Sequence, residues 1–145
     1  MKHLYTIFAL LLTLSNINAQ ESKTTLAVLD FEGRGINTLE AATLTDRFTS
    51  EIGKTESMVL VDRTMVEEIL KEQGFQQSGC TTDECAVEIG QLLGVKFLIT
   101  GSLGKLGKLY TINLKMIDVE TGKIKYKNSR ISRSTNFLFF KKILW

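Results

Sequence analysis

One stretch of this chain, residues 79–103, constrains the fold most strongly, because it joins a short amphipathic helix directly to an apolar strand. Thr82 is a favourable N-cap, and the two acidic residues after it suit the positive end of a helix dipole. Apolar side chains then recur at spacings of three and four, at Ala86, Ile89, Leu92 and Leu93. Gly94 ends this helix, and the unbroken apolar run at residues 97–99 predicts a strand buried on both faces. The stretch therefore predicts an α/β fold.

The remaining elements follow from apolar runs, which predict strands, and from amphipathic stretches behind capping residues, which predict helices. The expected strands lie at residues 26–31, 58–61, 97–103, 109–119 and 123–127. The other two helices follow Asn37 or Thr38 and Asp62, and their expected inner faces are Ala41, Leu44, Phe48 and Ile52, and Met65, Val66, Ile69 and Leu70. The fold class is α/β: a single mixed-sheet domain over residues 25–128, in the order β-α-β-α-α-β-β-β. Helices pack on its sheet, and the C-terminal strands form an antiparallel meander.

A glycine-rich segment follows the first strand. Gly33 and Gly35 match the start of a dinucleotide-binding fingerprint, but Thr38 stands where a third glycine is needed. The segment is interpreted as a tight strand-to-helix turn, with phosphate binding as the alternative.

The first nineteen residues are typical of a signal peptide. A basic start at Lys2 and His3 precedes an apolar run at residues 4–14, which is too short to span a bilayer comfortably. Cleavage after Ala19 is expected, and an uncleaved N-terminal anchor is the alternative. No cysteine lies near the cut, which argues against lipid attachment there. The protein is therefore predicted to be exported, to a periplasmic or outer-membrane-associated location.

Export makes a disulfide between the only two cysteines, Cys80 and Cys85, the expected state. The loop that it closes is short, so it would stabilise the fold by only about 2 kcal/mol. Two reduced thiols are the alternative. A structural zinc site is disfavoured, because it needs about four ligands and the only histidine lies in the predicted signal peptide.

Charge is divided between the two halves of the chain. Residues 20–95 carry 6 lysines and arginines against 14 aspartates and glutamates, whereas residues 96–145 carry 11 against 2. The sequence therefore predicts a basic interaction surface on the last strands, at Lys115, Lys123, Lys125, Lys127 and Arg130. Its partner would be anionic lipid, an acidic protein or the acidic half of another copy. Solvated lysines on an exposed sheet are the alternative, and export disfavours nucleic acid.

The sequence offers no pattern typical of a catalytic site. The predicted mature chain has no histidine, and no serine lies in a nucleophile-elbow motif. Asp30 and Glu32 could form a carboxylate pair, but a turn at the end of a strand accounts for them equally well. We therefore predict a protein that is not an enzyme and that uses no cofactor or metal.

Several motifs resemble those of the CsgG-like family, the curli production assembly/transport components, whose relatives include periplasmic lipoprotein activators. They are residues 26–32, 61–63, 69–75, the cysteine loop with Gly90, residues 99–102 and the turn at residues 118–122. The likeness covers roughly residues 25 to 127, and the domain is also similar to the N-terminal domain of TolB. The resemblance implies an envelope module that binds proteins in outer-membrane assembly or secretion.

Two departures from that family narrow the prediction. The sequence has no second long hairpin to span an outer membrane, and residues 129–145 replace an expected amphipathic helix with an irregular end. This tail is interpreted as a truncated or frameshifted end, or as a short segment that contacts a membrane surface. The main reading is a non-enzymatic module that binds envelope or outer-membrane proteins, and self-association is open. The alternatives are a subunit of a secretion pore and an accessory or activator of cell-wall synthesis.

Overall fold

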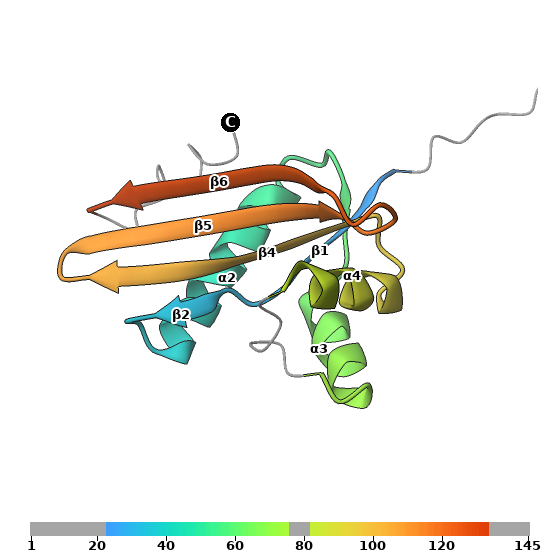
Figure 1. Cartoon of the computed structure of the whole chain (residues 1–145), viewed down its shortest axis with the longest axis horizontal. Helices are drawn as coiled ribbons and strands as arrows, with labels where there is room; N and C mark the ends of the chain where they lie inside the picture. Colours follow the sequence, from blue (N-terminus) through green and yellow to red (C-terminus); the bar gives the residue numbers. More distant parts are fainter. Residues whose placement is uncertain (1–22, 76–81, 134–145) are drawn as a thin grey trace, which may run out of the picture.

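The computed structural model describes residues 23–75 and 82–133, which form one open mixed sheet with helices on both faces (Figure 1). The strand order is β3-β1-β4-β5-β6, and the short strand β2, which is not part of this order, pairs with β4. The strands are β1 (Thr25–Val28), β2 (Glu32–Arg34), β3 (Val59–Leu60), β4 (Phe97–Leu106), β5 (Leu109–Asp118) and β6 (Ile124–Ser132). Strand β1 pairs in parallel with β3 and with β4, and β2 pairs in parallel with β4, whereas β4, β5 and β6 form an antiparallel meander. The predicted fold class is confirmed.

Three helices cover this sheet, and each begins at a capping side chain. They are α2 (Thr38–Gly53), α3 (Arg63–Glu72) and α4 (Asp83–Leu92). The side chains of Asn37, Asp62 and Thr82 accept hydrogen bonds from the backbone N–H groups of their first turns. No helix among these residues is long and apolar enough to cross a membrane.

The sheet separates two hydrophobic cores. Helix α2 packs on one face, where Phe48 meets Leu26, Ile99 and Leu114. Helices α3 and α4 share the other face, where Ile89 joins a cluster that includes Leu29, Leu98 and Ile117. Alternate residues of β1 and of the first part of β4 therefore enter different cores, which is why β1 and residues 97–99 are continuously apolar.

Two details of the expected fold differ from the structure. The segment after β1 is more than a turn, because Glu32–Arg34 forms a short strand parallel to β4 before Gly35 turns at φ +73°. On the helices, Met65 is 54% exposed and Leu92 is also exposed, so neither belongs to a buried face.

The core also contains one polar side chain that the apolar pattern did not reveal. Thr45 is fully buried in α2, and its hydroxyl donates to the carbonyl of Ala41 at 2.9 Å. The same oxygen accepts from the backbone N–H of Phe31 at 3.1 Å, which ties the segment after β1 to the helix. Both bonds offset the cost of burying the hydroxyl.

Candidate functional site

The candidate site is a polar area of the sheet on the side that carries α3 and α4. Cross-strand pairing places the side chains of Thr100, Ser102, Asn113, Lys115, Lys127 and Ser129 on this side. We call these residues the open face. They line a groove of about 280 Å³ together with Glu32 and Arg34 of β2. In Figure 1 the helices α3 and α4 lie toward one end of this face, and the strands extend beyond them.

Hydrogen bonds hold the middle of the open face in one arrangement. The side-chain amide of Asn113 donates to the Ser102 hydroxyl at 3.3 Å, and the Ser129 hydroxyl donates to the side-chain oxygen Oδ1 of Asn113 at 2.6 Å. Three neighbouring strands are therefore linked through one amide. Ser102 is buried at the base of this row, so Asn113 and Ser129 are the members that are exposed to a partner, and their side chains are held in place.

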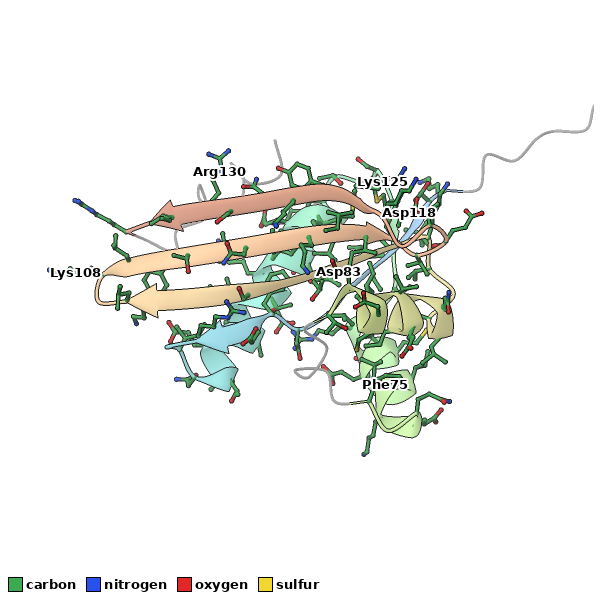
Figure 2. All side chains as sticks on the ribbon, viewed as in Figure 1. Phe75, Asp83, Lys108, Asp118, Lys125 and Arg130 are labelled. Carbon is green, nitrogen blue, oxygen red and sulfur yellow. The ribbon has the colours of Figure 1, made fainter. Side chains whose placement is uncertain are left out.

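The structure distributes the five predicted basic residues over different environments. Lys115 and Lys127 lie directly opposite each other on the open face. Lys115 forms an ion pair with Asp83 at the start of α4, and Asp83 is labelled in Figure 2 beside the sheet. Lys127 is exposed, and no ion pair to it occurs among the described residues.

The other three basic residues lie elsewhere. Lys123 belongs to the β5–β6 turn, and Lys125 is 3.7 Å from the Asp118 carboxylate. Arg130 pairs with Ile112, whose side chain enters the core under α2, so Arg130 is on the opposite side of the sheet. A single basic surface that includes all five residues stays a prediction.

A turn organised by Asp118 closes the β5–β6 hairpin. Its Oδ1 accepts from the backbone N–H of Thr121 at 2.9 Å and from the Thr121 hydroxyl at 2.8 Å. The backbone bond first, and then the hydroxyl bond, hold the pKa of Asp118 below its usual value. Gly122 supplies the positive φ of +66° that this turn requires.

The stability of the fold should therefore fall on acidification as Asp118 takes up a proton. Because its pKa is lower in the folded state, its contribution is present above about pH 4 and is lost as pH falls through the folded value. We expect the unfolding temperature of the Asp118→Asn variant to fall less steeply than that of the parent below this pH. Thermal unfolding followed from neutral to acidic pH measures this. Glu120→Gln, which removes an exposed carboxylate from the same turn, should behave as the parent does.

A second polar cluster surrounds Arg63 at the start of α3. Its Nη2 is 2.5 Å from Asp30 after β1, and its Nε is 3.3 Å from Glu67 one turn along. It also forms an ion pair with Asp46 of α2. Burial raises the pKa of Asp30, and the Arg63 guanidinium partly offsets this. Three segments of the chain thus meet at one cation, which the sequence pattern did not reveal.

The ion pairs also show that Asp30 and Glu32, which the sequence suggested as a possible carboxylate pair, have different partners. Asp30 binds Arg63, whereas Glu32 is 2.9 Å from its own arginine, Arg34. Each carboxylate therefore has a separate cationic partner. Within the described residues, no group of three or more histidine, cysteine, aspartate or glutamate side chains could hold a metal ion.

Removing the Arg63 side chain should destabilise the fold by about 2 kcal/mol, because Asp30 would keep its partial burial without a counter-charge. The loss of the cation would raise the pKa of Asp30 further, so the deficit should grow as pH rises above about 4. Urea unfolding of Arg63→Ala at acidic and neutral pH measures both effects. Lys71→Ala on the exposed side of α3 is the control. An equal loss of stability at both pH values would contradict the role assigned to Asp30.

Only one of the two cysteines of the predicted disulfide, Cys85, lies within the described residues. Cys85 lies in the first turn of α4 and has no free thiol. Cys80 lies outside the described residues, so the Cys80–Cys85 pairing stays a prediction. The predicted signal peptide and residues 134–145 of the tail also lie outside them.

Comparison with known proteins identifies the family. A sequence model of the peptidoglycan-synthase activator LpoB matches residues 11–130, which is most of the chain. The protein belongs to the LpoB family. Membership agrees with the prediction of an exported protein of the cell envelope. A comparison with curated protein sequences gives no match.

Solved structures share the fold. The LpoB C-terminal domain from Salmonella enterica is 16% identical with a TM-score of 0.64, covering 81% of this chain and 87% of that one. The NMR structure of E. coli LpoB is 18% identical with a TM-score of 0.63, and the match covers 75% of this chain but only 57% of that one. Lipoprotein GNA1162 from Neisseria meningitidis is 12% identical with a TM-score of 0.65, covering 83% and 91%. At these identities the likeness shows the fold alone.

The family match corrects the assignment made from the sequence. Membership of the CsgG-like family, and with it the curli reading, is wrong, because the matching model is that of LpoB. Several of the motifs behind that assignment meet needs of the fold, such as the positive φ of Gly122 and the close strand approach at Gly101. Such features identify a fold but do not identify a function.

Proposed function

We propose that this protein is a non-catalytic activator that binds a peptidoglycan synthase directly, on the periplasmic side of the envelope. The match of the LpoB model over residues 11–130 carries the proposal. It favours the cell-wall alternative over the secretion readings drawn from the sequence. Because the chain spans 57% of E. coli LpoB, the activity of the whole relative is part of the proposal.

The polar groups of the described residues support action by contact. The acidic side chains near the end of β1 neutralise arginines, and Asp118 organises a turn. These groups hold the fold together, and none of them is arranged around a reacting atom. A protein of this kind can change the activity of an enzyme by binding one of its conformations more tightly than another.

The open face is the surface that we assign to the synthase. Its row of hydrogen-bonded amide and hydroxyl groups is fixed, and the exposed Lys127 lies beside it. A partner with acidic side chains around a polar centre would complement this arrangement. Binding should then weaken as the salt concentration rises.

The test is a glycan-polymerisation assay with the synthase of the same organism, in the presence and absence of the mature protein. We expect a several-fold higher rate and co-purification of the two proteins. Lys127→Glu should weaken binding about tenfold, since it removes one charge pair and creates a repulsive one. Lys71→Glu, an equal charge change on α3, should bind as the parent does. A mature protein that neither binds nor stimulates the synthase would refute the proposed function.

A further inference from the structure

Exposed apolar side chains gather at one end of the molecule. Leu106, Leu39 and Ile131 have the highest exposed fractions of the large hydrophobic residues described, at 81%, 76% and 70%. Leu106 begins the β4–β5 turn, Ile131 lies near the end of β6, and Leu39 lies in the first turn of α2. We call residues 105–109 and 131–133 the sheet tip. In Figure 1 strands β4 to β6 extend to this end, far from α3 and α4.

The strand register places the apolar residues of the sheet tip together. Leu106 lies directly opposite Leu109, and Ile131 lies opposite Thr111, two residues further along the same strand. Residues two apart on a strand share a face, so Leu106, Leu109 and Ile131 project from the same side. The start of α2 lies on the other side of the sheet, because Lys105, which precedes Leu106 on the strand and faces away from it, has its Nζ 3.8 Å from Glu40 Oε1.

Cations accompany these apolar side chains. Residues 101–117 and 123–133 contain eight lysines and arginines and no carboxylate. At the sheet tip, Lys105 lies 5.0 Å from the centre of the Tyr110 ring, whereas Lys108 and Arg133 are exposed. Figure 2 shows Lys108 at the outermost point of the β4–β5 turn. No ion pair to Lys108 or Arg133 occurs within residues 23–75 and 82–133.

We propose that the sheet tip docks on the surface of a membrane that contains anionic phospholipid. Leucine and isoleucine at a protruding turn can enter the boundary between headgroups and acyl chains, while lysine and arginine beside them contact lipid phosphates. A patch of this composition costs free energy in water and marks an interaction site. A projecting turn suits a soft lipid surface, whereas a protein partner would need a matching hollow.

The composition of the chain beyond the described residues supports a lipid partner. The sequence continues from Arg133 into Phe137-Leu138-Phe139-Phe140-Lys141-Lys142-Ile143-Leu144-Trp145. Aromatic and aliphatic residues with lysines are the composition that favours a membrane interface. The same combination is thus present at the sheet tip and in the sequence that follows its last residue.

The test is sedimentation of the mature protein with vesicles of equal parts phosphatidylethanolamine and phosphatidylglycerol, and with pure phosphatidylcholine vesicles. We expect stronger binding to the anionic vesicles. The variant Leu106→Glu with Ile131→Glu should bind them at least about tenfold more weakly, because two apolar anchors are lost and two negative charges are added. Met65→Glu, which alters an exposed apolar residue of α3, should bind as the parent does. Unchanged thermal unfolding would show that the variants fold.

The assay contains no synthase, so its result is independent of the proposed function. Failure of the mature protein to sediment with anionic vesicles would overturn the inference. Equal sedimentation of the parent and the Leu106→Glu/Ile131→Glu variant would overturn it as well, since other residues would then hold the membrane. The same double variant can also be tested in the glycan-polymerisation assay. If it keeps vesicle binding but no longer activates the synthase, the sheet tip is a protein contact, which contradicts the proposal.

Discussion

Replacing Phe48 with alanine is expected to lower the free energy of unfolding by about 4 kcal/mol. Phe48 is 1% exposed in the middle of α2, and its ring lies 5.2 Å from that of Phe31, at an interplanar angle of 59°. The side chain fills the core between α2 and the sheet, so its removal loses transfer free energy and leaves a cavity. Urea unfolding measures the change. A loss of this size is a large share of the 5–15 kcal/mol that is usual for a domain.

Leu39→Ala on the same helix is the matched control for this prediction. Leu39 is exposed in the first turn of α2, so its truncation should change stability by less than about 0.5 kcal/mol. Similar losses in the two variants would mean that α2 does not rest on the sheet as described. A difference of several kcal/mol would support the assignment of Phe48 to the core.

The elements that the sequence predicts well are those whose signal is local. The caps at Asp62 and Thr82 and the turn at Gly122 depend on residues within a few positions of each other, and all three appear in the structure. The apolar runs of β1 and of residues 97–99 in β4 are equally easy to recognise, because both segments lie between the two cores.

The features that escaped prediction depend on partners far away in the chain. Strand β2 has only three residues and exists because β4 offers it an edge about seventy positions later, so no run or period marks it. The same holds for the cluster around Arg63, whose partner Asp30 lies 33 positions earlier. A pattern read along one stretch of sequence cannot reveal either arrangement.

The basic surface shows how one irregularity can change a site. Simple alternation places Lys123, Lys125 and Lys127 on one side of the last strand. A register shift, however, pairs Met116 with Tyr126 and Ile117 with Ile124, so Lys125 is the extra residue of a bulge. Residues on either side of a bulge no longer follow the period of two. The groups on the open face could therefore be found only once the pairing was known.

Replacing Gly101 with alanine should lower the free energy of unfolding by about 3 kcal/mol. A Cβ at this position would lie 2.2 Å from the Asn113 carbonyl oxygen and 2.9 Å from Leu114 Cδ2. The carbonyl cannot move aside independently, because Asn113 belongs to a ladder of ten residue pairs between β4 and β5. The two strands must therefore shift apart or twist. Since Ser102 and Asn113 form the centre of the open face, the same shift should also weaken synthase binding if the proposed function is correct.

Gly53→Ala provides the comparison that separates close strand approach from the general effect of losing a glycine. A Cβ on Gly53 would meet only a methyl group at the end of the Leu60 side chain, at 3.3 Å, and that side chain can turn away. Because Gly53 is the last residue of α2, alanine should leave stability unchanged or raise it by up to about 1 kcal/mol. Opposite signs for the two alanine variants in urea unfolding would support the tight β4–β5 approach. A Gly101→Ala variant as stable as the parent would show that the two strands can yield at this point, and that the spacing of the open face is not set there.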